Sequence, residues 1–210
     1  MSASLQAYLK QLPQGLESYP QFKLKGSVFR QFMDGIDAKA LLPHLPSPLH
    51  TWVHEPPGDN GWIPEVHSWA VLAVSVDVVF DSLDAFQAYA YEVNHKAMGR
   101  PLYRALMAFI SPERAVRVAG KTWSYIHAGS TLEVQELDGK RLELIIRHPR
   151  MAYPQFMLEA LGGGFLAVAR LAGEPETTVR YIRGAPEETH YELDWHGQKG
   201  AKTDGDRAFS

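Results

Sequence analysis

The stretch that decides the fold is TLEVQELDGKRLELIIR, residues 131–147. Apolar and polar side chains alternate on both sides of Leu137-Asp138-Gly139, which is typical of two strands that each bury one face. The stretch therefore predicts a β-hairpin of Thr131–Glu136 and Lys140–Arg147. Its apolar face is expected to pack under the helix that follows.

The alternation also distinguishes between two registers of this hairpin, because a slip of one residue moves every side chain to the other face of the sheet. A two-residue loop would set Gln135 opposite Leu142 and mix polar with apolar side chains on one face. A three-residue loop sets Val134 opposite Leu142 and keeps one face apolar, with Gly139 in the left-handed conformation that such loops require. We therefore predict the register with the three-residue loop.

Beyond the hairpin, the sequence predicts a helix over Tyr153–Ala172 and a second pair of strands, Thr177–Ile182 and Thr189–Trp195. Gly162–Gly164 interrupts the helix, at a cost of roughly 1 kcal/mol per glycine relative to alanine. These glycines indicate either close packing of the helix on the sheet or a break between two helices. The order of elements, β-β-α-β-β, is typical of an antiparallel sheet in an α+β fold.

The chain before the hairpin is expected to be helical, because apolar residues recur in it at helical spacing. The segment from Pro64 to Phe80 is apolar almost all round, which predicts a buried central helix. The prolines between Leu42 and Pro64 predict a long connector in which a regular helix is disfavoured. We expect one domain over residues 1–195 and a disordered polar tail over residues 196–210. Helices are predicted at Ser2–Leu12, Gly26–Phe32, Asp37–Leu42, Pro64–Phe80, Leu83–Met98, Pro101–Ile110 and Pro112–His127.

Composition and charge exclude several classes of protein. The 210 residues include 45 % hydrophobic and 21 % charged residues, which is ordinary for a globular chain. Cysteine is absent, so disulfides, thiolate metal sites and cysteine nucleophiles are excluded. A net charge of −3 with scattered basic residues argues against binding of nucleic acid. The sequence shows neither a secretory signal nor an apolar run long enough to span a membrane, so a cytoplasmic location is expected.

Several short motifs resemble those of an uncharacterised protein family that is expanded in myxobacteria and their relatives. The resemblance extends from about Leu16 to Trp195. Because that family has no settled activity, the resemblance implies no reaction and no ligand. The motifs are Gly15–Pro20, Lys25–Phe29, Gly61–His67, Pro101–Arg104 and the segment from Trp123 to Gly129.

The order of elements is also similar to that of haem-nitric-oxide-binding domains, 4-vinyl-reductase domains and Golgi-transport tethering subunits, and this resemblance implies a ligand-sensing or assembly module. Haem-binding members carry Tyr-x-Ser-x-Arg on the second hairpin strand and an iron-ligating histidine in the helix before the hairpin. The matching segment here, Ile146–Arg150, keeps only the arginine. The helix Pro112–Ile126 contains no histidine, and His127 lies at its end. Haem is therefore disfavoured, and no cofactor is predicted.

One pair of histidines has the spacing of metal ligands. His50 and His54 are four residues apart and Glu55 follows them, which on a helix would suit a zinc ion. The flanking prolines favour an exposed pair in a loop instead. No metal site is predicted.

Glu65, His67 and Asp77 stand out because they lie in an otherwise apolar helix, where a buried charge must be paired. Either His67 and Asp77 line a pocket, or Glu65 stabilises the helix N-terminus and Asp77 is satisfied by an arginine or by backbone donors. Three arginines likewise fit either a bound carboxylate or phosphate, or a solvated surface and capped strand ends: Arg104, Arg147 and Arg150.

The sequence lacks serine nucleophile motifs, nucleotide-binding fingerprints and carboxylates at a catalytic spacing, so we predict a protein that is not an enzyme. The leading hypothesis is a cytosolic sensor domain that binds a small ligand between its helices and its sheet. The alternative is a protein-interaction or assembly module that forms a homodimer or binds a regulatory partner. The residues predicted to line the ligand pocket are Trp62, His67, Asp77, Tyr103, Arg104, Trp123, Arg147 and Arg150.

Overall fold

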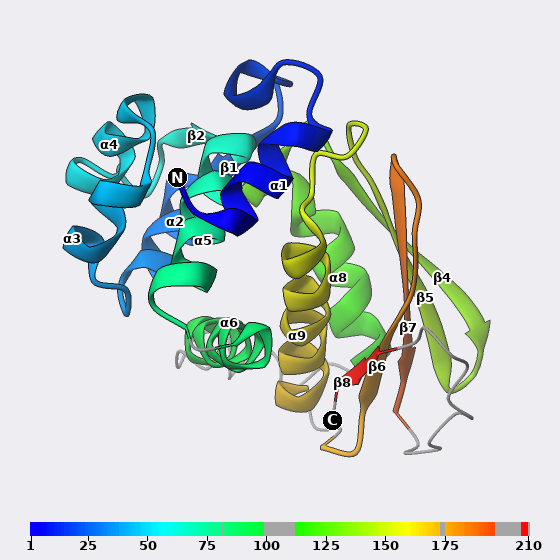
Figure 1. Cartoon of the computed structure of the whole chain (residues 1–210). Helices are drawn as coiled ribbons and strands as arrows, with labels where there is room; N and C mark the ends of the chain where they lie inside the picture. Colours follow the sequence, from blue (N-terminus) through cyan, green and yellow to red (C-terminus); the bar gives the residue numbers. More distant parts are fainter. Residues whose placement is uncertain (81, 99–111, 173–174, 196–206, 210) are drawn as a thin grey trace.

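The computed structural model describes residues 1–80, 82–98, 112–172, 175–195 and 207–209. A helical N-terminal part lies beside an antiparallel sheet, and helices cover one face of that sheet (Figure 1). One apolar core extends through both parts, from Leu5 and Trp69 among the helices to Leu144 and Tyr191 in the sheet. The predicted α+β class, with helices followed by β-β-α-β-β, is confirmed.

The helical part is built around α5, Glu65–Val78, which is buried over most of its length as its apolar sequence predicts. Helix α1 packs against it, and the side chain of Ser2 caps α1 by accepting a hydrogen bond from the Leu5 N–H. Ser82 caps α6 in the same way through the Ala85 N–H. Besides α5, the α-helices that the structure describes before the hairpin are α1 (Ala3–Gln11), α2 (Gly26–Met33), α3 (Ala38–Leu41), α4 (Ser47–His54), α6 (Leu83–Met98) and α8 (Pro112–Ile126).

Helix α4 corrects the prediction for the proline-rich connector. Ser47–His54 is helical, with Pro48 in the first turn, where its missing N–H costs nothing. His50 and His54 therefore do lie on a helix, and the His50 Nε2 atom is 3.1 Å from the Leu45 carbonyl oxygen. The predicted helix at Pro101–Ile110 lies outside the described residues.

A small sheet that the sequence did not predict joins the helical part to the end of α8. Its strands are β1 (Lys23–Lys25), β2 (Trp62–Pro64) and β3 (His127–Ala128), in the order β2-β1-β3. Leu24 pairs with Ile63 on one side and with His127 on the other. Three segments that are far apart in the sequence thus meet at one place.

The predicted hairpin forms from β4 (Thr131–Asp138) and β5 (Arg141–Arg147), but its predicted register is wrong. Val134 lies opposite Leu144 rather than Leu142. The error is two residues, so the same side chains still share the buried face. Gly139 does not adopt the left-handed conformation, since the positive-φ glycines among the described residues are Gly15 and Gly129.

The side chain of Asp138 explains the observed turn. Its Oδ1 atom accepts a hydrogen bond from the Lys140 N–H at 2.9 Å, and its Oδ2 atom pairs with Arg141. Asp138 is therefore the last residue of β4 opposite Arg141, and the extra residue is taken up by a bulge between Glu136 and Asp138.

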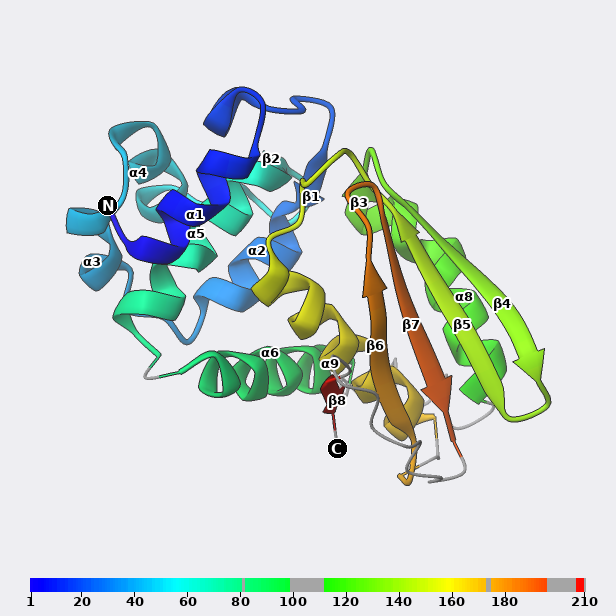
Figure 2. The same cartoon turned by 45° about the vertical axis from the view of Figure 1, so that its right-hand side comes forward.

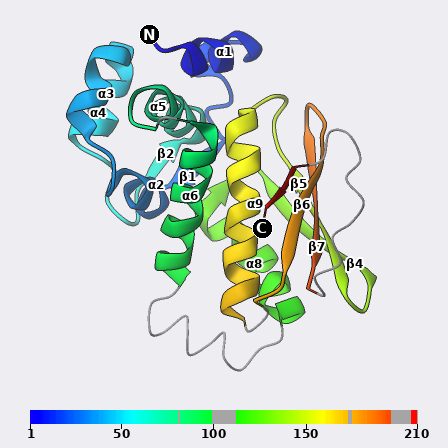
Figure 3. The ribbon, with the colours of Figure 1, turned by 60° about the horizontal axis from the view of Figure 1, so that its bottom comes forward.

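Helix α9, Gln155–Leu171, runs without a break through its three glycines. A Cβ atom on Gly163 would lie 3.6 Å from the Tyr91 side chain, and one on Gly164 would lie 3.5 Å from Asn94. Both neighbours belong to α6, which lies along α9 (Figure 3). Of the two predicted alternatives, the break between helices is wrong, and at Gly163 and Gly164 the close approach is to a helix rather than to the sheet.

The larger sheet has the order β4-β5-β7-β6-β8, with every neighbouring pair antiparallel (Figure 2). Strands β6 (Thr178–Gly184) and β7 (Glu188–Asp194) form the second predicted pair. Strand β8, Arg207–Phe209, pairs with β6, so these residues of the predicted disordered tail are a strand. The rest of the tail lies outside the described residues. None of the described helices combines the length and the apolarity that crossing a membrane demands.

Candidate functional site

A buried carboxylate–imidazole pair lies where the helical part meets the small sheet. Glu65 begins α5 directly after β2, and His127 begins β3. Because β1 pairs with both β2 and β3, the two side chains are brought together. Glu65 Oε1 lies 2.9 Å from His127 Nδ1, with the two side chains 0 % and 4 % exposed.

The aromatic side chain of Trp123 holds this histidine in place. The Trp123 ring stacks on the His127 ring at a centroid distance of 3.8 Å and an interplanar angle of 12°. The Trp123 Nε1–H donates to the Ser130 hydroxyl at 3.0 Å, which fixes the orientation of the indole. One face of the His127 imidazole is therefore covered, and its Nδ1 atom is engaged by Glu65.

Buried polar atoms without a hydrogen bond gather around the pair. Ser68 Oγ and Trp69 Nε1 have no hydrogen-bond partner among the described residues, and Glu65 Oε2 and the Tyr153 hydroxyl lack a hydrogen bond of good geometry, although the hydroxyl lies close enough to the Glu65 carboxyl to lower its pKa. The Tyr153 and Trp69 rings are 5.8 Å apart. Buried polar atoms in proteins nearly always have a partner, so this cluster has the hydrogen-bonding capacity to accept a ligand or water. We refer to Glu65, His127, Tyr153, Trp69 and Ser68 as the junction cluster.

Burial controls the ionisation of the junction cluster. It raises the pKa of the Glu65 carboxyl, and His127 offsets part of that rise. Burial, followed by the nearby Glu65 charge, raises the pKa of both Tyr8 and Tyr153 well above the ordinary value. Both phenols are therefore neutral at physiological pH and keep their protons for donation. Tyr8 already donates its proton to the Ala152 carbonyl at 2.6 Å.

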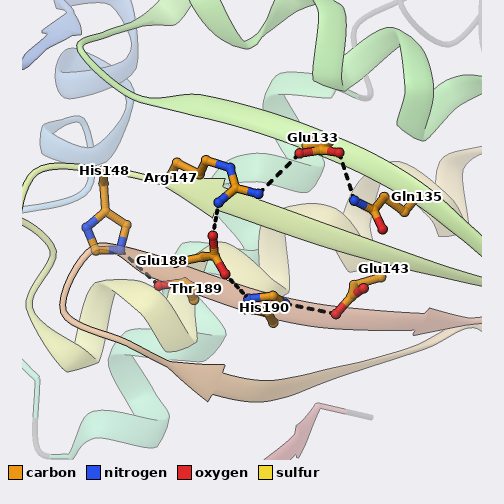
Figure 4. Close-up of polar contacts among 8 residues, drawn as sticks. All are labelled: Glu133, Gln135, Glu143, Arg147, His148, Glu188, Thr189 and His190. Atoms are coloured by element: carbon orange, nitrogen blue, oxygen red, sulfur yellow. Dashed lines mark hydrogen bonds and ion pairs between the residues drawn. The ribbon is translucent and has the colours of Figure 1, made fainter.

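A second group of polar residues lies along β4, β5 and β7, near the end of β5 and the start of β7 (Figure 4). Arg147 pairs with Glu188 on β7 and, at 3.4 Å, with Glu133 on β4. His190 lies between Glu188 and Glu143, at 2.6 Å and 2.8 Å. Glu143 and Arg147 lie on the face of β5 opposite the buried Leu144, and β7 alternates in the same way, so these side chains point away from the core.

His148 is buried next to this group. Its Nε2 atom lies 3.0 Å from the Thr189 hydroxyl oxygen, and its ring meets the Tyr153 ring edge-on at a centroid distance of 5.0 Å. Burial lowers its pKa, although the backbone of Pro149 and the charges of Glu187 and Glu188 oppose that effect. His148 is thus a neutral side chain between the surface and the junction cluster.

The predicted site residues lie in several places. Trp62 is 37 % exposed, with the Lys25 ammonium 4.4 Å from its ring centroid. His67 accepts from the Trp52 indole, and Asp77 accepts two hydrogen bonds from Ser4 at the start of α1.

The structure brings together two of the predicted residues, Arg147 and Arg150, which line one surface cleft. Trp123 stacks on His127, a member of the junction cluster. Tyr103 and Arg104 lie outside the described residues. Sequence reasoning did not connect Glu65 with His127, although a carboxylate opening an apolar helix was a usable signal.

Comparisons with known proteins support the fold. No protein-family model matches the chain, and no curated protein matches it. Among solved structures, it is similar to an oxygen-binding H-NOX domain related to soluble guanylate cyclases, with 8 % identity, a TM-score of 0.57, and coverage of 85 % of this chain and 97 % of that one. It is also similar to an Fe(II) unliganded H-NOX protein from K. algicida, with 16 % identity, a TM-score of 0.52, and coverage of 81 % and 96 %. A third is an H-NOX structure used to probe the function of haem distortion, with 10 % identity, a TM-score of 0.56, and coverage of 81 % and 92 %.

These similarities correct one prediction from the sequence. Haem was disfavoured because the Tyr-x-Ser-x-Arg motif and a histidine inside the helix before the hairpin are missing. That prediction is contradicted, since the solved structures that share this fold include an oxygen complex, an Fe(II) protein and a haem-distortion study. At such low identity the likeness shows an H-NOX-like fold. The resemblance to the uncharacterised family stays a prediction.

Proposed function

We propose that this chain is a non-catalytic sensor domain that binds a small ligand at the junction cluster, and that haem is the ligand to test first. The observation that carries the proposal is the buried Glu65–His127 pair, with the unpartnered Ser68 hydroxyl and Trp69 indole N–H on the same helix as Glu65, in a chain with an H-NOX-like fold. The cytoplasmic location expected from the sequence is part of the same proposal.

His127 suits the role of an iron ligand by its chemistry. Ligand histidines usually have their other ring nitrogen bonded to a carboxylate or carbonyl, which fixes the tautomer and the ring orientation. Here Glu65 engages Nδ1, so Nε2 is the atom that would take the iron, and Trp123 fixes the plane of the ring. Bound haem would supply an iron able to bind a small gas molecule.

The arginine that survives from the haem-domain motif does not contribute to the junction cluster. Arg150 is exposed and lines the surface cleft together with Arg147. The proposal therefore relies on His127 and Glu65 for the ligand and assigns no role in it to Arg150.

The test is an absorption spectrum of the purified full chain after titration with haem, beside native mass spectrometry of the freshly purified protein. We expect a Soret band with one equivalent of haem, and its loss in His127→Ala. His50→Ala, which removes a half-buried histidine from α4, is the matched control and should keep the band.

Three outcomes are informative. A Soret band that persists unchanged in His127→Ala would contradict the assignment of the iron ligand. If a small molecule other than haem co-purifies and its binding requires Glu65 or Tyr153, the sensor proposal stands but haem is not the ligand. The absence of any bound small molecule in both measurements would overturn the proposal.

The interaction-module alternative rests on one observation. Val118 and Tyr125 are seven residues apart on α8, so they share one face of the helix. Their side chains are 41 % and 72 % exposed. If this face forms a homodimer, sedimentation should show a dimer that Tyr125→Lys dissociates. A strictly monomeric chain would exclude that form of the alternative.

A further inference from the structure

A surface cleft of about 500 Å³ lies between the turn that follows β5 and the turn that joins β6 to β7. That volume falls within the range of sites for small molecules. The cleft lies on the outside of the molecule and is separate from the junction cluster, so a ligand here would be a second one. Its lining residues are Arg147, His148, Arg150, Ala185, Pro186, Glu187 and Glu188.

The two walls of the cleft are held together by backbone hydrogen bonds. The His148 N–H donates to the Glu187 carbonyl at 3.0 Å, and the Met151 N–H donates to the Pro186 carbonyl at 2.6 Å. These bonds tie the segment after β5 to the β6–β7 turn. The cleft is therefore largely formed before any ligand arrives, which limits the entropy that binding would cost.

Unfavourable backbone conformations gather at this wall. Met151 and Tyr19, the positive-φ residues other than glycine in the described ranges, each have a φ of 56°. The Tyr19 hydroxyl donates to the Arg150 carbonyl at 2.8 Å, and Met151 follows Arg150 directly. Each such conformation costs roughly 1 kcal/mol or more and is found most often where a functional geometry is being held.

The charges in the cleft are only partly neutralised. Arg147 is paired with Glu188 and Glu133. Among the residues that the structure describes, the Arg150 guanidinium has no acidic partner within 4.0 Å, and the Glu187 carboxylate has no lysine or arginine partner, although its charge acts on His148. The two do not form an ion pair with each other, since none within 4.0 Å is found, although both line the cleft from opposite walls. One cation and one anion are left facing a shared space.

We propose that this cleft binds a small zwitterion, with the ligand's carboxylate on Arg150 and its ammonium group on Glu187. A planar guanidinium is well suited to hold a carboxylate through two parallel hydrogen bonds. The Arg147–Glu188 pair lines the cleft without adding net charge, which suits a ligand that is neutral overall. His148, with one nitrogen at Thr189, joins the cleft to the ring of Tyr153 in the junction cluster.

The test is isothermal titration calorimetry of the full chain with a panel of the twenty common amino acids, β-alanine and γ-aminobutyrate, each at millimolar concentration. For any member that binds, the N-acetylated form removes the ammonium charge and the amide form removes the carboxylate charge. We expect each of these derivatives to bind about tenfold more weakly or worse.

Variants assign the charges to residues. Arg150→Gln should weaken binding of the zwitterion and bring its affinity down to that of the amide form. Glu187→Gln should weaken binding of the zwitterion and bring its affinity down to that of the N-acetylated form. Lys140→Gln, which removes an exposed charge at the other end of the hairpin, is the matched control and should leave the affinity unchanged. No binding by any member of the panel, or equal affinity in Arg150→Gln, would overturn the proposal.

Discussion

His127 Nδ1 lies 2.9 Å from Glu65 Oε1, and this contact joins two residues that are 62 positions apart in the chain. It connects the first turn of α5 to β3, the short strand that follows α8, through a buried polar contact. Burial alone would make either group costly, and their pairing offsets part of that cost.

The first prediction concerns the stability that this pair contributes. Glu65→Ala should lower the free energy of unfolding by about 3 kcal/mol, because it leaves a buried imidazole without its partner. Urea denaturation of Glu65→Ala, His127→Ala and the double variant measures the coupling. The two single losses should sum to clearly more than the loss in the double variant. Strict additivity would mean that the contact carries no interaction energy.

The second prediction concerns the approach of α9 to α6. A Cβ atom on Gly163 would meet the Tyr91 side chain and backbone at ordinary contact distances of 3.6–3.9 Å. Gly163→Ala should therefore raise the free energy of unfolding by up to about 1 kcal/mol through helix propensity. Gly163→Leu should lower it by about 1–3 kcal/mol, because the larger side chain has no space between the helices. Thermal unfolding of both variants measures whether each substitution stabilises or destabilises the fold. Destabilisation by Gly163→Ala would contradict the ordinary contact distances at this position.

The hairpin shows how far local pattern carries a prediction. Alternation in residues 131–147 predicts two strands and the side chains that share a face, because successive side chains of a strand point to opposite faces of the sheet. It cannot distinguish registers that differ by two residues. That choice depends on Asp138, whose side chain binds the Lys140 N–H and Arg141 and so places the turn.

The junction cluster could not be predicted from local sequence pattern, for a different reason. Glu65 and His127 meet because Leu24 pairs with both Ile63 and His127 in a sheet of very short strands. Strands of two or three residues are too short to show a periodicity. The conspicuous polar residue could be picked out in the sequence, but its partner could be found only from the tertiary structure.

The third prediction is a pH dependence at His190. Burial acts to lower the pKa of His190, but hydrogen bonds and charges from Glu143 and Glu188 outweigh it and raise the pKa above the ordinary value. A raised folded-state pKa stabilises the fold fully below the unfolded-state pKa of about 6.5, and this stabilisation is lost as the pH rises through the folded-state value. His190→Asn should flatten that decline in urea titrations between pH 6 and pH 9. The exposed His44→Asn is the control, and the same flattening there would refute the assignment.

The fourth prediction has the opposite sign and concerns His67. The Trp52 indole N–H donates to its Nδ1 at 2.9 Å, so Nδ1 carries no proton, and Nε2–H is left to donate to the Leu16 carbonyl at 3.1 Å. Protonation would break the bond from Trp52, and burial lowers the pKa of His67, with the Leu16 carbonyl and the Glu17 charge opposing.

Since the folded-state pKa of His67 lies below the unfolded-state value, the unfolded chain takes up the proton first as the pH falls below about 6.5, and stability declines toward acid. His67→Gln cannot become charged and should remove part of that decline, at the expense of weaker packing at neutral pH. Trp52→Phe removes the donor and leaves Nδ1 free to be protonated, so it should raise the pKa of His67 measured by NMR titration of the ring protons. An unchanged pKa in Trp52→Phe would show that the indole hydrogen bond does not hold the neutral form.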